Sequence, residues 1–187
     1  MQRIVLASGS PRRRQLLEWA EIDFDVIVPS TAETWPPGLP MAEIPVHIAR
    51  NKALAVRGTV APGRLILAAD TVVVLEEEII GKPVDREDAV RILLRLAGRQ
   101  HNVITGVNLL KGEEELSFSD STAVWFHELS RTEIESYVDR YRPYDKAGAY
   151  AIQEWIGVVG IKRIEGDFYN VMGLPVSRVV RALRDWG

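Results

Sequence analysis

Residues 65–74 read Leu-Ile-Leu-Ala-Ala-Asp-Thr-Val-Val-Val, a strongly apolar run that carries one carboxylate, Asp70. Residues 65–69 form a continuous apolar segment, which is typical of a central strand. A carboxylate within such a run is expensive to bury unless it is paired, binds a metal or lies at a strand end facing a cleft. The run therefore predicts a buried strand and a functional acid. The alternative is an aspartate whose oxygens accept backbone N–H groups at a bulge.

Apolar segments separated by turn residues extend outward from this run in both directions. Strands are predicted at residues 4–7, 24–28, 71–75, 78–81, 103–110, 117–126 and 156–164, and helices after Ser10, over 42–56, from Asp85 to Gly98, after Ser130 and from Pro175. Ser10-Pro11 and Ser130-Arg131-Thr132-Glu133 are typical helix starts. Because no helix separates the long strands 103–110 and 117–126, a mixed sheet is favoured over a strictly parallel one.

The composition is that of an ordinary globular enzyme. The chain has 187 residues, of which 47% are hydrophobic and 26% charged, and we expect one domain over residues 1–187. The net charge is −3, so the chain lacks the overall positive charge that is typical of nucleic-acid-binding proteins. No apolar run approaches the length of a membrane span, so we expect neither membrane association nor export.

Cysteine and histidine usage excludes several classes of site. The absence of cysteine rules out disulfides, iron–sulfur clusters, thiolate zinc sites and a cysteine nucleophile, and it fits a cytoplasmic location. His47, His101 and His127 show no metal-ligand spacing, so we interpret them as surface or packing residues.

The segment Leu-Ala-Ser-Gly-Ser-Pro-Arg-Arg-Arg, residues 6–14, predicts an anion site. A strand delivers a Ser/Gly loop to a helix N-terminus, where free backbone N–H groups point outward. Arg12 and Arg13 add donors suited to phosphate. This is not a Walker A loop. The alternative is a capped surface helix with solvated arginines.

Two lysines and a glutamine complete the candidate set. Gly81-Lys82-Pro83 presents Lys82 on a rigid turn, and Lys52 lies four residues after Ile48, near the buried stripe of its helix. Gln153 ends a stretch rich in small residues and offers both a donor and an acceptor to a base edge. A solvated hairpin lysine, a lysine stem along apolar surface and a surface glutamine are the structural alternatives. Together, several cations, one carboxylate in an apolar run and a helix N-terminus suit a nucleoside triphosphate bound with a divalent metal.

The chain resembles the Maf family of nucleotide pyrophosphatases along nearly its whole length. Six motifs carry the resemblance in order: LASGSPRRRQLL, IARNKALA, AADTVVV, GKPVDREDA, YDKAGAYAIQ and VMGLPVSRV. The family fold implies an α/β structure with a long mixed sheet flanked by helices and a cleft between two lobes, similar to inosine triphosphatase.

The resemblance also implies a role for each candidate residue. Asp70 is the essential acid, and Glu33 helps it to bind the metal, Mg²⁺ or Mn²⁺. Phosphates are held by Ser8, Arg13, Lys52 and Lys82. Arg12, Thr71 and Gln153 match the subgroup that acts on dTTP and UTP, whereas the 7-methyl-GTP subgroup carries Trp, Gln and Glu at these positions.

The expected activity is therefore hydrolysis of dTTP and UTP to the monophosphate and pyrophosphate, an acid-anhydride hydrolase reaction. The sequence does not rank dTTP, UTP, CTP and modified pyrimidine nucleotides. One alternative is 7-methyl-GTP hydrolysis, against which the three specificity positions argue. Another is a non-catalytic inhibitor of septum formation, which would not need a buried base. The nucleotide is the expected partner, and the oligomeric state is open, with a homodimer as the leading hypothesis.

Overall fold

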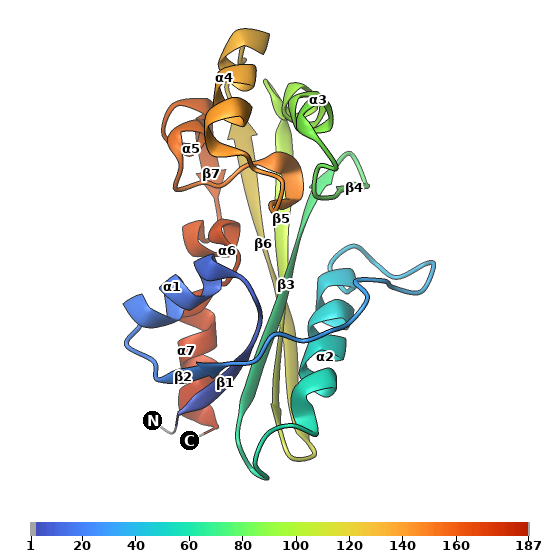
Figure 1. The fold of residues 1–187 in the computed structure, drawn as a ribbon, viewed down its shortest axis with the longest axis vertical. Coiled ribbons are helices and arrows are strands. Elements are labelled where there is room, and N and C mark those ends of the chain that lie inside the picture. Colours follow the sequence, from blue (N-terminus) through green and yellow to red (C-terminus); the bar gives the residue numbers. More distant parts are fainter. Residues whose placement is uncertain (1–2, 187) are drawn as a thin grey trace. The chain divides into compact units, whose positions relative to one another are not determined.

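The computed structural model describes residues 3–186 and has the mixture of strands and helices that the sequence predicts (Figure 1). In chain order the elements are β1 (Ile4–Ala7), α1 (Pro11–Trp19), β2 (Phe24–Val26), α2 (Ile44–Arg57), β3 (Ile66–Leu75), β4 (Glu78–Ile80), α3 (Arg86–Leu96), β5 (Gln100–Lys111), β6 (Glu114–Phe126), α4 (Arg131–Tyr141), the 3₁₀ turn η1 (Ala147–Ala149), α5 (Trp155–Gly160), β7 (Ile161–Glu165), α6 (Phe168–Met172) and α7 (Val176–Asp185).

The strands between residues 3 and 186 form a seven-stranded sheet in the order β2-β1-β3-β5-β6-β7, and β4 pairs with β3 off this path. β1 pairs in parallel with β2 and β3, whereas the β3/β4 and β6/β7 pairs are antiparallel. The expected α/β class with a mixed sheet is confirmed.

The chain forms two compact units. The first contains residues 3–71, 105–120 and 173–186, and the second contains residues 72–104 and 121–172. Strands β3, β5 and β6 are 10, 12 and 13 residues long, and each contributes residues to both units. The first unit holds α1, α2 and α7, and the second holds α3, α4, α5 and α6.

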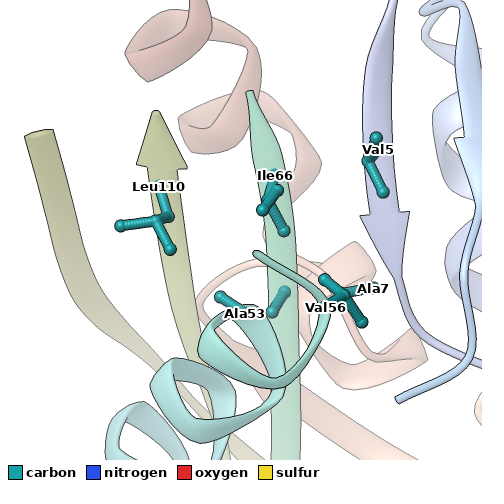
Figure 2. Close-up of a cluster of buried hydrophobic side chains, with 7 residues drawn as sticks. Val5, Ala7, Ala53, Val56, Ile66 and Leu110 are labelled. Carbon is teal, nitrogen blue, oxygen red and sulfur yellow. The ribbon is translucent and has the colours of Figure 1, made fainter. Parts of the chain in front are cut away.

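Strand β1 lies at the centre of the first unit's core. All four of its residues are buried, and successive side chains point to opposite faces of a strand, so both faces are covered. Figure 1 shows α2 on one side of β1 and β3, with α1 and α7 on the other. The cluster on the α2 side consists of Val5, Ala7, Ala53, Val56, Ile66, Ala68 and Leu110 (Figure 2).

Gly106 of β5 permits a close approach of α2. A Cβ at this position would lie 2.1 Å from the backbone nitrogen of Val46 and 2.2 Å from the carbonyl carbon of Pro45. No side chain fits in that space, so the start of α2 contacts the backbone of the sheet directly. This contact helps to set the position of α2, the helix that carries Lys52.

The predicted helix starts are confirmed. Ser10 is the N-cap of α1, its hydroxyl accepts the N–H of Arg13 at 3.4 Å, and Pro11 is the first helical residue. Ser130 and Glu133 form a reciprocal capping box at the start of α4. These signals are local, so they operate regardless of the rest of the fold.

The predicted strands differ from the structure at two places. Residues 65–69 and 71–75 belong to one strand, because β3 continues through Asp70 from its pairing with β1 to its pairing with β4. The strand expected over residues 156–164 begins only at Ile161, and residues 155–160 form α5. β-branched residues favoured a strand there, but Gly157 lets this helix lie against the Ile152 carbonyl, which a Cβ would approach to 1.7 Å.

A buried aromatic cluster lies in the second unit. The rings of His101, Phe126 and Tyr150 meet edge to face with centroids 5.0–5.5 Å apart. His101 Nε2 is 2.7 Å from the Tyr150 hydroxyl, and the residue is 1% exposed. Burial lowers the pKa of His101 to about 4, so it is neutral at physiological pH. Of the two interpretations of the histidines, surface residue or packing residue, the second holds for His101.

Candidate active site

Lys52 connects two carboxylates in the first unit. Its Nζ donates to Oδ1 of Asp70 at 2.6 Å and to Oε1 of Glu33 at 2.7 Å. Lys52 and Asp70 are buried, at 8% and 7% exposure, whereas the Glu33 side chain is 45% exposed. Lys52 lies on the buried side of α2, Asp70 belongs to β3, and Glu33 comes from the segment between β2 and α2. The structure thus brings together three of the residues that the sequence singled out.

The pairing explains how β3 tolerates a carboxylate in its apolar run. Removing two opposite charges from water costs several kcal/mol for each ion, and this cost is offset only when the geometry is good and further hydrogen bonds are made. Asp70 has the ammonium of Lys52, and Lys52 has a second acceptor in Glu33. Asp70 is therefore satisfied by a side chain from another element, not by backbone N–H groups of a bulge alone.

Asp70 and Glu33 are the carboxylates that could hold a metal at this position. Across the described part of the chain, no group of three or more His, Cys, Asp and Glu side chains could hold a metal ion. Mg²⁺ is usually held by one or two carboxylates together with substrate phosphates and waters. Two carboxylate oxygens around one cation position are the kind of ligand that a hard divalent ion takes, with its remaining positions filled from outside the chain.

Arg13 is buried and makes three hydrogen bonds, so the solvated-arginine alternative is wrong for it. Its Nε donates to the Gly173 carbonyl at 2.8 Å, Nη1 to Ser8 Oγ at 3.3 Å and Nη2 to Thr71 Oγ1 at 3.0 Å. Burial lowers the pKa of Arg13, whereas the negative charge of Asp70 opposes that shift. Arg13 connects the loop after β1, the middle of β3 and the segment before α7.

Thr71 and Ser8 are held by the same network. The hydroxyls of Thr71 and Thr105 are 2.9 Å apart, and Ser8 Oγ also accepts the N–H of Ser10 at 3.1 Å. Thr105 and the Gly173 carbonyl were missed by sequence reasoning. Gly173 lies inside a quoted motif without an assigned role, and Thr105 has no local signal at all.

Arg12 lies beside Arg13 on α1 and is half-buried. Its positive charge contributes to the lowered pKa of Arg13, which places the two cations close together. The N-terminus of α1, Arg12 and Arg13 thus place positive charge beside the Ser8 loop, and anion binding there stays a prediction.

Lys82 and Gln153 belong to the second unit. Both side chains are exposed. Lys82 follows β4, where the Gly81 carbonyl accepts the N–H of Gly148 at 3.1 Å. That bond connects the Lys82 loop to the small-residue stretch that precedes Gln153.

Lys146 is a buried cation that sequence reasoning left without a role. It is 9% exposed, and its Nζ lies 2.8 Å from Asp145 Oδ1 and 3.6 Å from Glu154 Oε1. Its position inside the quoted motif YDKAGAYAIQ was the available signal. The second unit therefore has a buried lysine whose carboxylate partners are more exposed, at 56% for Asp145 and 20% for Glu154.

No helix among residues 3–186 has the length and apolar character needed to cross a membrane.

Known proteins are similar to this chain over nearly its whole length. A family model described as Maf-like protein matches residues 3–186. A dTTP/UTP pyrophosphatase from Cytophaga hutchinsonii is 51% identical over 180 residues, covering 96% of this chain and 82% of the relative. A dTTP/UTP pyrophosphatase from Porphyromonas gingivalis is 50% identical, covering 99% of this chain and 94% of the relative.

Among solved structures, a HAM1 protein from Coxiella burnetii is similar in fold. Its TM-score is 0.53 at 16% identity, with 99% of this chain and 100% of that chain covered. At this level of identity the similarity supports the α/β architecture alone.

Proposed function

The chain belongs to the Maf family, and we propose that it is a nucleoside triphosphate pyrophosphatase that hydrolyses dTTP and UTP to the monophosphate and pyrophosphate. The observation that carries this proposal is the buried Lys52 shared by Asp70 and Glu33 at 2.6 and 2.7 Å. A carboxylate that accepts a hydrogen bond from a lysine, in a unit that also holds Arg13 and the α1 N-terminus, suits attack of water on a phosphate anhydride.

Asp70 is the general base in this mechanism. Water attacks the α-phosphorus in line, its proton passes to Asp70, and the bond from the α-phosphorus to the bridging oxygen breaks to release pyrophosphate. Asp70 orients the water through one carboxylate oxygen while the other contacts Lys52. The loss of charge on Asp70 during proton transfer frees the Lys52 ammonium to interact more strongly with the phosphates.

Lys52, Lys82 and Arg13 neutralise the charge that develops on the phosphates and the leaving group. A guanidinium has five N–H donors, and the three bonds that Arg13 makes to its own unit fix its plane while leaving donors for a phosphate oxygen. Ser8 adds a hydroxyl next to this guanidinium. Such fixed donors need little reorganisation when the charge develops.

Asp70 and Glu33 would hold a divalent metal, Mg²⁺ or Mn²⁺, together with the triphosphate oxygens. The metal would supply further charge neutralisation at the phosphates.

Gln153, Thr71 and Arg12 are the specificity residues of the proposal. Uracil and thymine share a Watson–Crick edge of carbonyl, N–H and carbonyl, which the amide of Gln153 can complement in part. Thr71 is small and is held by Arg13 and Thr105, so it leaves room beside the Arg13 network. Arg12 lies next to Arg13 and would fix the loop or the sugar.

We further propose that residues 1–187 act as one functional domain in the cytoplasm, with the nucleotide as their substrate and a homodimer as the working assembly. The absence of cysteine fits a reducing compartment. Light scattering on the purified protein tests the assembly independently of activity.

The test is a comparison of kcat/KM on dTTP, UTP, CTP, GTP and 7-methyl-GTP with Mg²⁺, with release of pyrophosphate and of the monophosphate both measured. We expect dTTP and UTP to be turned over much faster than GTP and 7-methyl-GTP. Equal values for purines and pyrimidines would contradict the base assignment alone. Preference for 7-methyl-GTP would support that alternative activity, and binding without turnover would support the non-catalytic inhibitor. Gln153→Glu should weaken pyrimidine turnover more than it weakens folding.

A further inference from the structure

Gln153 lies in a tight turn of the second unit. The N–H of Glu154 donates to the Ala151 carbonyl at 3.1 Å, so residues 151–154 form a turn with Ile152 and Gln153 at its two central positions. Ile152 is 3% exposed, whereas Gln153 is exposed. The turn therefore anchors one side chain in the core and presents the next one to solvent.

The hydroxyl of Tyr137 contacts both ends of this turn. It accepts the N–H of Ala151 at 3.3 Å and donates to Oε2 of Glu154. One oxygen atom on α4 thus connects the first and last residues of the segment that carries Gln153. Glu154 is also the residue before α5, and its side chain makes no capping bond to that helix.

The Tyr137 ring is fixed independently of its hydroxyl. Tyr137 is 1% exposed and stacks against Tyr141 at 4.9 Å and Trp155 at 6.4 Å between ring centroids. Burial, aided by the negative Glu154, raises the pKa of the Tyr137 hydroxyl, so it remains a hydrogen-bond donor throughout the physiological range. The donor thus keeps both its proton and its position.

Glu154 is partly buried and has a second charged neighbour. Its carboxylate lies 3.6 Å from Lys146 Nζ, and its side chain is 20% exposed. A carboxylate with this little access to water depends on its hydrogen-bond donors for its position. Removal of the Tyr137 hydroxyl would take one hydrogen-bond donor from the Glu154 carboxylate and would leave the Ala151 N–H without its acceptor.

We propose that Tyr137 is a positioning residue for base recognition, because its hydroxyl holds both ends of the turn that presents Gln153 to the pyrimidine. This inference rests on the proposed function, in which Gln153 reads the base. A hydrogen-bonding side chain discriminates between bases only when its direction is fixed, since a mobile amide can satisfy several edges equally well. Tyr137 therefore acts on substrate selectivity through Gln153 and does not touch the reacting phosphates.

The experiment measures the selectivity ratio, kcat/KM for UTP divided by kcat/KM for GTP, on single preparations of each variant. The concentration of folded enzyme cancels in this ratio, so a variant that is merely less stable leaves it unchanged. Tyr137→Phe keeps the stacked ring and removes only the hydroxyl. We expect its ratio to fall roughly tenfold, since hydrogen bonds to charged groups are the strong ones, with most of the change in KM for UTP.

Tyr141→Phe is the matched control. It removes a tyrosine hydroxyl from the same helix and the same aromatic stack, and its ring contacts Tyr137 and Arg140. Its ratio should stay within about twofold of wild type. A fall like that of Tyr137→Phe would show that any change in the stack alters selectivity, and it would overturn the role of the hydroxyl.

A double-mutant cycle with Gln153→Ala tests whether Tyr137 acts through Gln153. In that background Tyr137→Phe should no longer change the ratio. An equal fall in both backgrounds, or no fall in either, overturns the proposal. If Tyr137→Phe yields no folded protein, Glu154→Gln takes its place in the cycle with the same expectations. Wild-type enzyme that fails to turn over UTP, or that treats UTP and GTP alike, would contradict the proposed function before any variant is made.

Discussion

Asp70→Asn separates the catalytic role of this residue from its structural one. The substitution keeps the shape of the side chain and removes its charge. Lys52 Nζ lies 2.6 Å from Asp70 Oδ1, and the two side chains are 10% and 11% exposed, so this is a largely desolvated ionic contact. The asparagine oxygen can still accept a hydrogen bond from Lys52, and Glu33 remains as the charged partner at 2.7 Å.

The expected loss of stability follows from this geometry. The contact changes from an ion pair to a hydrogen bond between the Lys52 ammonium and a neutral amide, so the free energy of unfolding should fall by about 1–2 kcal/mol. For a chain of 187 residues this corresponds to a decrease in Tm of about 2–8 °C. A protein with a typical stability of at least 5 kcal/mol then stays about 99% folded at 25 °C.

Turnover should fall much further, by at least ~100-fold, because a general base contributes that much to the rate. The assay is release of pyrophosphate from dTTP with Mg²⁺, with kcat and KM determined at 25 °C alongside thermal unfolding. Since unfolding removes only about 1% of the enzyme, the remaining loss is chemical.

Asp25→Asn is the control. Asp25 is another ion-paired aspartate of the first unit, with Arg64 at 2.7 Å and Arg3 at 2.9 Å. The Asp25→Asn variant should show a similar or smaller change in Tm with unchanged kcat. If Asp70→Asn retains kcat within threefold of wild type, Asp70 is a structural ion-pair partner and the mechanism is refuted.

Arg13→Ala should lower Tm as well as turnover, because the Gly173 carbonyl loses a buried donor worth about 1–3 kcal/mol; full stability and activity together would contradict the network. His101 has a folded pKa of about 4, below its ordinary value of 6.5, so its contribution to stability is fully present above pH 6.5 and is lost as the pH falls toward 4. Over this interval wild type should lose about 3 kcal/mol more than His101→Gln does; identical pH profiles would refute the assignment. Gly106→Ala should abolish or severely reduce folded protein, since its Cβ would meet the Pro45 carbonyl carbon at 2.2 Å; a near-normal Tm would mean that α2 lies elsewhere.

The amino-acid sequence alone was sufficient to predict features that depend on residues close together in the sequence. Ser10-Pro11 and the Ser130–Glu133 capping box begin helices because they satisfy backbone N–H groups within one turn. The apolar run around Asp70 marked both a buried strand and an acid that needs a partner, since burial of a charge has the same cost in any fold. A strand was predicted where the structure has a helix at residues 156–160, because a short β-branched run is compatible with either.

Only the tertiary structure decided which groups satisfy that acid and its neighbours. Lys52 reaches Asp70 across 18 residues, and Arg13 reaches the Gly173 carbonyl across 160. Such contacts follow from the packing of α2 against β3 and of α1 beside the start of α7, which no local pattern specifies. The same holds for Thr105, Lys146 and Tyr137, whose partners come from other elements. The chemistry of a side chain follows from the residue type, but its partner depends on the position of the whole backbone. A shift of about 1 Å is enough to break a hydrogen bond.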